Sequence, residues 1–528
     1  VNGNLGGPCT VNTGGGLAGG GTIGGTVTVN GGTIAPSGIN GATGATGGTG
    51  TAGSTITTGG LALGAGSTTQ VRTTQTGTSD SINVNGSASV GGQLATLPSA
   101  GTYGPSTSYT IINATGGITG AYAIVVQSTL PFLNASVKQQ GNQLILTLSQ
   151  AGGGTGTGGT PFNQFAGLNG NQYRMATALQ TIATSGGNPL PTLLGYTRGL
   201  TADQVIRSFD SLTGETYASA ANAELGGQAQ YQDTLFTRLR LARDTGEQTS
   251  AVWAVPYTSS SDFDRSTDVA HTDYRIHGLI IGADAPVTPD LRIGVHANLA
   301  NSRTQVDRRG DYTDVDQAAI GIHALYFNQQ QWWAEGMASY GWQSADSSRR
   351  VSVGPFTPQA TGSYDGKAIN AALEGGYRFQ LGKDLHLEPF VGAYYTKVKY
   401  DSFTEKGAGD ADLRVGRANA TSMQYGVGAR LVGDVDLGVA GTKLHPIVVV
   451  RYLHNTKDDT VSVNNAFAGV PSDSFVVQGS RPVKNHWQAG VGVSFDITPA
   501  ASTFVDYSAG GAKHSTRKAV NLGFRGNC

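Results

Sequence analysis

The sequence is poor in cysteine and in charge, and each shortage excludes a class of protein. Its two cysteines, Cys9 and Cys528, stand at opposite ends, which excludes a disulfide framework or a cysteine zinc site. Charged residues make up 13% of the 528 residues, about half their usual share. The formal net charge of −1 leaves no basic excess for neutralising phosphates, so we expect no nucleic-acid partner.

Long apolar runs and catalytic motifs are missing as well. No stretch of about 18 apolar residues occurs, so the sequence contains no candidate transmembrane helix. A transmembrane β-barrel is not excluded, because only alternate residues of its strands face lipid. We find no Gly-x-Ser-x-Gly elbow with fitting partners, and the glycine-rich run 151–160 lacks the lysine of a phosphate-binding loop.

The nine histidines show no metal-binding spacing, so we predict neither a metal nor a cofactor. They are His271, His277, His296, His323, His386, His445, His454, His486 and His514.

Glycine, by contrast, is abundant, and the chemistry of the chain changes along its length. The 80 glycines are about twice the usual share. Before position 160 the only charged side chains are Arg72, Asp80 and Lys138, whereas all five tryptophans lie after position 250. Two parts with such different compositions are expected to have different architectures.

Residues 1–150 have the pattern of a polar, glycine-rich β-solenoid. Short β-branched segments follow glycine pairs at 22–23, 26–27 and 33–34. Each rung of such a coil buries its apolar side chains on those of the next rung, while Gly and Asn form the corners. A flexible Gly/Thr linker is the alternative for residues 1–60. After Leu61 the rising apolar content predicts strands at 109–112, 123–126 and 144–148.

Residues 151–249 are predicted to hold a glycine-rich linker and a helical region. Asn171–Ala183 has helical apolar spacing, and Thr201 with Gln204 forms a capping box that opens a helix to about Leu212. A longer helix is predicted for Glu215–Asp244. Its small Ala, Gly and Gln side chains suit a polar barrel lumen, and its last 21 residues span roughly the 30 Å thickness of a bilayer's hydrocarbon core.

After residue 250 the apolar period changes from 3.6 to 2. Ile293, Val295 and Ala297, for example, alternate with Arg292 and His296. One apolar and one polar face are what a barrel with lipid outside and water inside requires, so residues 250–528 are predicted to form a twelve-stranded antiparallel barrel. The strands are expected at about 250–259, 273–285, 290–304, 315–328, 330–345, 364–380, 385–401, 420–436, 443–456, 485–497, 500–509 and 516–526.

The connections between these strands alternate between short and long. Short turns at 286–289, 329, 381–384, 437–442 and 498–499 separate longer polar connections at 260–272, 305–314, 346–363, 402–419, 457–484 and 510–515. Outer-membrane barrels have short periplasmic turns and long external loops. The segment Ser474–Gln478 could extend the tenth strand or form a hairpin in its loop. Arg309-Gly310-Asp311 spells an integrin-type tripeptide, for which a solvated loop is the plainer interpretation.

Several strings resemble the autotransporter (type Va secretion) family. Asp80-Ser-Ile-Asn-Val-Asn-Gly86, Leu97-Pro98 and Gly120-Ala-Tyr122 are similar to the end of a pertactin-like β-helical passenger, where folding outside the cell begins in the family. Phe209-Asp-Ser-Leu-Thr-Gly-Glu215-Thr-Tyr-Ala218 is similar to the segment before the translocator barrel. Gly282-Ala-Asp284 and Leu387-Glu-Pro389-Phe390 resemble recurrent barrel-strand patterns.

The resemblance implies an outer-membrane translocator with a helix through its lumen, which exports its own β-helical passenger to the cell surface. Outer-membrane lipid, the barrel-assembly machinery and periplasmic chaperones would be its partners, together with a host-surface or matrix receptor for the passenger. The chain ends on Gly526-Asn527-Cys528 instead of the family's aromatic residue, so the assembly signal would fall on Phe524. A surface adhesin that is merely anchored by the barrel is the alternative.

Two further features of the family are not matched. The long helix lacks the Asn-Asn pair at which some members cut off the passenger, because Asn222 stands alone. The early Gly-Asp-Ser block of the branch with serine hydrolase activity is also missing. We therefore predict neither self-cleavage nor an enzyme.

Charged residues of the predicted strands and the long helix form the candidate site. They are Glu335, Glu374, Glu388 and Arg451 on strands, and Arg238, Arg240 and Arg243 on the helix. Our hypothesis is that the lumen carboxylates pair with the helix arginines and hold the helix in the pore. The alternative is that each group faces water independently.

Overall fold

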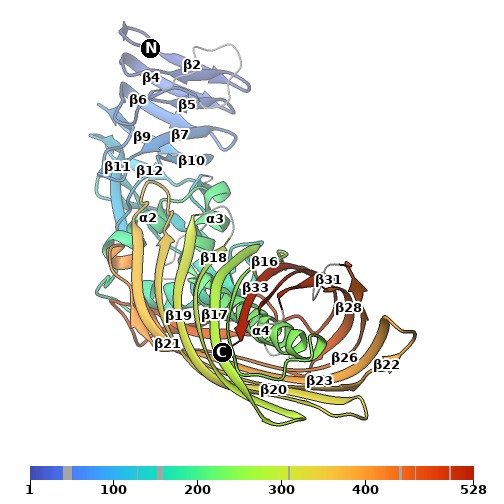
Figure 1. Ribbon diagram of the computed structural model, residues 1–528. Helices are drawn as coiled ribbons and strands as arrows, with labels where there is room; N and C mark the ends of the chain where they lie inside the picture. The colour runs from blue at the N-terminus through green and yellow to red at the C-terminus, as the bar shows by residue number, and fades with distance from the viewer. Residues whose placement is uncertain are drawn as a thin grey trace. The chain divides into compact units, whose positions relative to one another are not determined.

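The computed structural model describes residues 1–39, 50–127, 129–151, 159–306, 310–438, 443–457, 460–498 and 501–527 (Figure 1). The chain forms two compact units. The first contains Val1–Leu212 with Val351–Pro358 and Gly469–Asp473, and the second contains Thr213–Arg350, Gln359–Ala468 and Ser474–Cys528. Most of the predicted linker and Arg309 of the tripeptide lie outside the described residues.

The first unit begins with a coil of parallel strands. One sheet contains β1 (Asn4–Leu5), β2 (Cys9–Asn12), β4 (Thr22–Asn30), β6 (Thr55–Leu63), β8 (Ser81–Val84), β9 (Ala88–Val90), β11 (Ser106–Ala114), β12 (Ile118–Gly120), β14 (Leu133–Gln140) and β15 (Gln143–Gln150). The other contains β3 (Gly16–Ala18), β5 (Thr33–Ala35), β7 (Thr68–Thr73), β10 (Gln93–Pro98) and β13 (Ile124–Gln127).

The register of these strands places equivalent residues of successive rungs on top of one another. Val27 of β4 pairs with Leu61 of β6, and Ile82 of β8 pairs with Ile112 of β11, each in parallel. These four side chains are buried, so the rungs share one apolar core, as a solenoid requires. Residues 1–39 contain β1 to β5, which contradicts the linker alternative for that stretch. The coil ends on the antiparallel pairs of β15 with β11 and β14.

Three helices pack within this first unit: α1 (Gly170–Thr184), α2 (Pro191–Arg198) and α3 (Ala202–Leu212). Phe209 of α3 stacks on Phe132 with ring centroids 5.7 Å apart. Arg198 is fully buried and donates to Gln150 Oε1 (2.8 Å) and to the Tyr103 carbonyl (3.1 Å). Burial lowers the pKa of the Arg198 guanidinium to about 10. The helices before Leu212 therefore belong to the first unit.

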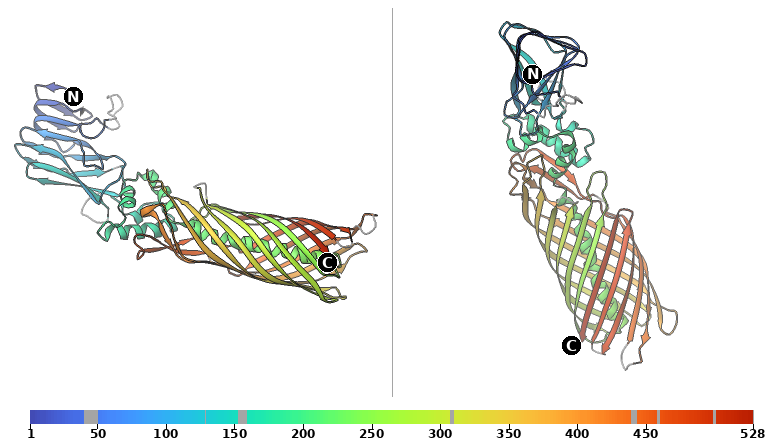
Figure 2. Two further views of the ribbon diagram at one scale, coloured as in Figure 1. Left: turned by 60° about the vertical axis from the view of Figure 1, so that its left-hand side comes forward. Right: turned by 90° about the horizontal axis from the view of Figure 1, so that it is seen from above.

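The second unit is an antiparallel barrel (Figures 1 and 2). Its twelve long strands are β16 (Ala251–Phe263), β17 (Thr272–Thr288), β18 (Leu291–Val306), β19 (Asp311–Phe327), β20 (Trp332–Arg350), β21 (Gln359–Tyr377), β23 (Leu385–Tyr400), β26 (Ala418–Gly433), β28 (Lys443–Asn455), β31 (Asn485–Thr498), β32 (Ala501–Ala512) and β33 (Ser515–Asn527). The pairing of β16 with β33 closes the sheet, which confirms the predicted barrel. The two-residue strands β22 (Phe379–Gln380) and β27 (Val435–Asp436) lie beside the short turns.

The alternation of side chains gives the barrel an apolar outer wall. Val295 and Ile322 are each 61% exposed on the outside, whereas Arg292 and His296 are buried on the inside. Exposed apolar side chains recur on all twelve strands, at the same face that the period-two pattern predicted. The outside is thus built to contact hydrocarbon.

Several strands extend further toward the long connections than the sequence predicted. β19 begins at Asp311 instead of 315, β20 reaches Arg350 instead of 345, and β21 begins at Gln359 instead of 364. Beyond the apolar belt the outward side chains are polar, so the apolar-polar contrast disappears while the hydrogen-bond ladder continues.

The helix α4 (Glu215–Asp244) lies inside the barrel, as predicted (Figure 2). A sheet formed by two long connections covers its first turns, and this sheet was not predicted. It contains β24 (Phe403–Thr404), β25 (Leu413–Val415), β29 (Ser462–Phe467) and β30 (Ser474–Gln478). Ser474–Gln478 pairs with Ser462–Ala466, so the loop-hairpin interpretation of this segment is confirmed.

Among the described residues, no helix has the length together with the hydropathy needed for a membrane span.

Candidate functional site

The candidate site is the lumen of the barrel, where the last turns of α4 meet the wall. Arg240 of α4 lies between two carboxylates, Glu335 of β20 at 2.9 Å and Glu374 of β21 in a short contact. The register places Glu335 directly opposite Glu374, so their like charges are brought together and the guanidinium bridges them. Both carboxylates are fully buried.

Arg243, one turn later, reaches a different part of the wall. Its Nη2 lies 2.7 Å from Glu388 of β23, and its Nη1 lies 3.6 Å from Glu335. The guanidinium also lies over the ring of Trp333, 4.1 Å from its centroid, where a cation is attracted by the π face. Glu388 and Glu335 thus bind the same helix residue from two strands.

Arg238 faces the opposite side of the lumen. It lies 3.3 Å from Asp284 of β17 and 3.1 Å from Glu247, which follows α4. Arg292 of β18 donates to Asp284 at 2.7 Å and holds the carbonyl of Thr249 at 2.8 Å. This second network fixes the segment between α4 and the first strand.

Sequence reasoning named the helix arginines and three strand glutamates but missed the wall arginines. Arg378 contacts Asp244 and Glu388 at 2.5 Å each, and Arg430 lies 2.9 Å from Glu388 and in short contact with Asp244. Arg378 immediately follows β21, and Arg430 occupies a lumen position of β26 by the period of two. That signal was available in the sequence. Arg451 pairs with Asp233 of the helix at 2.5 Å and lies 3.6 Å from Glu374, and none of the helix arginines is its partner.

The middle turns of α4 bind the wall largely through hydrogen bonds with amide and hydroxyl groups. Glu224 is buried and accepts hydrogen bonds from Ser302 and from Gln317 (2.7 Å). Gln232 donates to Thr396 at 2.9 Å, and His296 lies 2.6 Å from the Tyr231 hydroxyl. These amide and hydroxyl contacts come from several strands, so α4 is fixed around its circumference.

The first turn of α4 is bound by the sheet of the long connections. Tyr217 contacts Glu405, which also holds Arg349 of β20 (Nε to Oε1, 2.8 Å). Asn465 of β29 donates to the carbonyl of Thr213 at 3.0 Å, and Glu215 accepts from the backbone of Ala270 at 2.7 Å. The N-terminal end of α4 therefore lies among the long connections.

The helix does not fill the lumen evenly. Two cavities lie between α4 and the strands β28, β31, β32 and β33. Asp233, Arg451 and Gln488 line both cavities, and Arg517 lies 2.7 Å from Asp233. The ion pairs of Asp233 therefore stand between the two cavities.

Phe524, the expected assembly signal, lies on the outer face of β33 and is 53% exposed. His296, His323 and His445 are buried in the lumen, whereas His277 is exposed on the outside.

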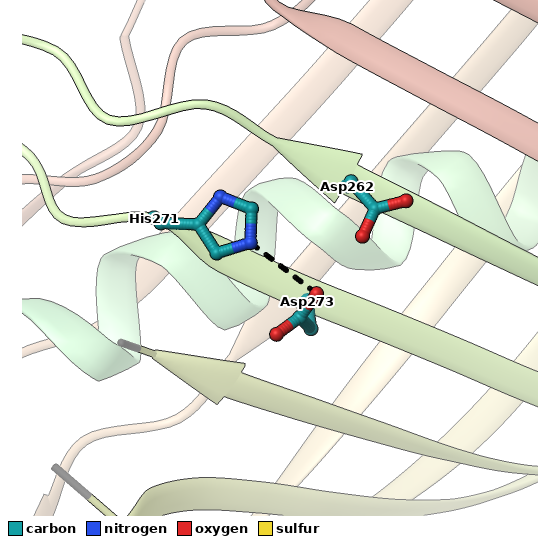
Figure 3. Close-up of side chains that lie close together, drawn as sticks. All are labelled: Asp262, His271 and Asp273. Carbon is teal, nitrogen blue, oxygen red and sulfur yellow. Dashed lines mark ion pairs between the residues drawn. The ribbon is translucent and has the colours of Figure 1, made fainter. Parts of the chain in front are cut away.

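One group of possible metal ligands forms beside a long connection (Figure 3). Asp262 and Asp273 are directly opposite on β16 and β17, and His271 Nε2 lies 3.3 Å from Asp273 Oδ1. One ligand atom from each lies within 4.8 Å of the others. The His-x-Asp spacing at a strand start was the sequence signal. His271 and Asp273 are about half exposed, and we assign no metal to them.

The comparisons with known proteins concern this barrel. Residues 252–508 match the family model described as the autotransporter beta-domain. The esterase EstA of Pseudomonas aeruginosa is 25% identical over 267 residues, which are 49% of this chain and 40% of EstA. Outer membrane protein B of Rickettsia prowazekii is 21% identical over 54% of this chain and 18% of its own length. The extracellular serine protease of Serratia marcescens is 23% identical over 61% and 34%. The chain thus spans less than half of each relative.

Solved structures with a similar barrel include two from autotransporters. The translocator domain of the autotransporter NalP from Neisseria meningitidis has 16% identity and a TM-score of 0.45, covering 57% of this chain and 98% of that one. The transport unit of the autotransporter AIDA-I from Escherichia coli has 18% identity and a TM-score of 0.42, covering 56% and 98%.

Proposed function

Because residues 252–508 match the autotransporter beta-domain family, we propose that this barrel exports the polypeptide that precedes it. The barrel lies in the bacterial outer membrane and is a translocator domain without enzymatic activity of its own. The proposed cargo is the solenoid stem at residues 1–150 with any passenger attached to it. Residues 151–249 are the proposed connection and pore helix, and residues 250–528 the translocator.

The direction of α4 carries this proposal. Its N-terminal turn contacts the long connections through Tyr217 and Glu215, whereas Asp244 at its C-terminus contacts Arg378, beside a short turn. Long connections face the outside of the cell and short turns the periplasm. A chain that runs through the lumen in this direction leaves residues 1–212 on the external side.

Folding of the exported stem is the proposed driving force, and no nucleotide is required. Side chains such as Ile111 and Leu94 are exposed in a threaded chain but fully buried once the rungs stack outside. Burial of apolar surface stabilises the folded chain outside relative to the unfolded chain in the lumen. Folding therefore opposes backward movement of the chain by mass action. After export, the ion pairs of Arg240 and Arg243 retain α4 as a plug.

Partners follow from this route. A chain that inserts a barrel into the outer membrane would need periplasmic chaperones and the barrel-assembly machinery, with Phe524 as the proposed signal. A host-surface or matrix receptor would bind the displayed passenger. The stem as a surface adhesin is compatible with export, because the barrel would then serve as both translocator and anchor.

Protease shaving of intact cells tests the proposal. We expect an external protease to remove residues 1–212 and to leave a membrane-protected fragment of about residues 215–528. A periplasmic marker protein must stay uncut in the same cells, which controls for leakage. If residues 1–212 are cut only after the outer membrane is permeabilised, the proposed export is wrong.

A further inference from the structure

The outer wall of β20, β21 and β23 carries three lysines at the edge of its apolar belt. Odd-numbered residues of β21 and β23 face outward, as Leu373 (60% exposed) and Val391 (62% exposed) show. Lys367, Lys397 and Lys399 lie on this same face, toward the long connections. A basic group on a lipid-facing wall is costly unless it reaches the interface or meets a counter-charge.

The register brings these ammonium groups together. Lys367 stands directly opposite Lys399. Lys397 stands opposite Ile369, and this pair is the next one on the same face toward the apolar belt. Like charges directly opposite each other destabilise a sheet. Within the described part of the chain, none of the three lysines forms an ion pair. The three ammonium groups are therefore unpaired among the described residues, and together they are complementary to an anion.

Aromatic side chains mark the level of the three lysines relative to the membrane. Trp342 of β20 stands opposite Lys367, and Tyr340 stands opposite Ile369. Their rings are in contact, with centroids 5.1 Å apart, and Trp342 is half exposed. Tryptophan and tyrosine gather where hydrocarbon meets headgroups. The lysines therefore lie at the depth of lipid headgroups in the external leaflet.

Two grooves on the outer wall meet at this level. The apolar groove is lined by residues such as Ile281, Ile320 and Ile369. The polar groove contains Trp342 and Lys367. Because Ile369 and Lys367 are two residues apart on one face of β21, the grooves adjoin. An acyl chain in the first groove would place its headgroup in the second.

Acidic residues on the side of the lysines away from the apolar belt restrict where a ligand can carry its negative charge. Asp365 and Asp401 are adjacent, and the Asp401 amide donates to the Asp365 carbonyl at 2.9 Å. Both lie nearer the long connections than the three lysines do. A ligand must therefore present its anionic group next to its apolar part, and neutral hydroxyl groups further out. A phosphate that joins acyl chains to a polyhydroxyl headgroup has this order, whereas free phosphate gains nothing from the apolar groove.

We propose that Lys367, Lys397 and Lys399 bind the phosphate group of a lipid in the external leaflet of the outer membrane, with its acyl chains in the apolar groove. The site is independent of export, because none of the three side chains faces the lumen.

Lipid binding to the full chain in non-ionic detergent tests the site, with phosphatidic acid as the probe and native mass spectrometry as the readout. We expect the wild type to bind it, and the variant K367Q/K397Q/K399Q to lose roughly 100-fold in affinity, since each of the three basic residues at an anionic surface contributes about a fivefold step. Raised salt should weaken wild-type binding and leave the weak binding of the variant unchanged.

The matched control is K383Q/K443Q/K513Q, which removes three exposed lysines elsewhere and should bind like the wild type. Equal far-ultraviolet spectra of all variants show that the barrel is folded. The proposal is overturned if the first variant binds as the wild type does, or if phosphatidylcholine competes equally well. It is overturned too if inorganic phosphate alone displaces the lipid at comparable concentration, because the site would then recognise phosphate without the acyl chains.

Discussion

At the scale of single residues, the main charged contacts of the lumen are made by buried, desolvated arginines. Arg243 is buried between Glu388 and Glu335 and lies over Trp333. A buried ion pair adds little net stability, because desolvation offsets the attraction between the charges. Breaking one leaves an uncompensated charge and costs about 3–5 kcal/mol. Such pairs therefore specify the depth and rotation of α4 more than they stabilise the barrel.

The variant R240Q/R243Q should loosen α4 in the lumen. It removes the cations that bind Glu335 and Glu374 from the helix, so these two carboxylates repel each other and attract water, while Glu388 keeps Arg378 and Arg430. We expect a higher and noisier single-channel conductance in planar bilayers than for the wild type.

The control for this measurement is R207Q/K383Q, which removes two exposed cations outside the lumen and should conduct like the wild type. If R240Q/R243Q conducts like the control, the pairs do not hold the helix and its neutral contacts suffice.

The lumen pairs show how far residue-level reasoning from sequence extends. The period of two assigns Glu335, Glu374 and Glu388 to the inside, and the helix arginines to the same space. The sequence could not indicate which partners meet, because this depends on the rotation of α4 and on the stagger of the strands. Arg451 was grouped with these residues, and it contacts Glu374 at 3.6 Å, but its helix partner is Asp233 and none of the helix arginines.

At the scale of elements, the sequence predicted the strands and helices that have a clear apolar period, and it did not predict the short strands that have none. All twelve long strands and α4 follow from alternation and helical spacing. The sheet of β24, β25, β29 and β30 was missed because its strands have two to six residues and lie in polar loops. Strand pairs of this length are stabilised by packing on α4 and not by a pattern of their own.

A close approach between α4 and the wall gives an element-scale prediction. A methyl group on Gly227 would overlap the Tyr274 hydroxyl and lie 3.0 Å from its Cζ, whereas one on Gly226 would have 3.9 Å to Ser261 Oγ. Tyr274 is buried and rigidly packed. We expect Gly227→Ala to destabilise the barrel by about 1–3 kcal/mol through overpacking.

Gly226→Ala is the matched control, and it should stabilise by about 0.4–1 kcal/mol because alanine restricts the unfolded chain. Urea unfolding in detergent micelles, read by fluorescence of the five tryptophans, measures both variants. Equal and favourable effects at the two positions would mean that α4 is not seated against Tyr274.

At the scale of the whole molecule, export and folding are coupled only if folding occurs after passage through the barrel. The solenoid supplies a suitable energy source, because its core is distributed over rungs that form one after another. In the proposed route, each rung that stacks outside removes chain from the lumen.

The variant Ile111→Asp tests this coupling. Ile111 is fully buried in β11, so an aspartate there leaves a charge in the apolar core and costs about 3–5 kcal/mol of stem stability. We expect residues 1–212 to stay on the periplasmic side, where antibody or protease reaches them only in permeabilised cells. Thr110→Asp places the same charge on the exposed face one residue earlier and should be displayed normally. Normal display of the Ile111→Asp stem would separate export from stem folding and require another driving force, because the lesion lies outside the barrel and leaves the lumen unchanged.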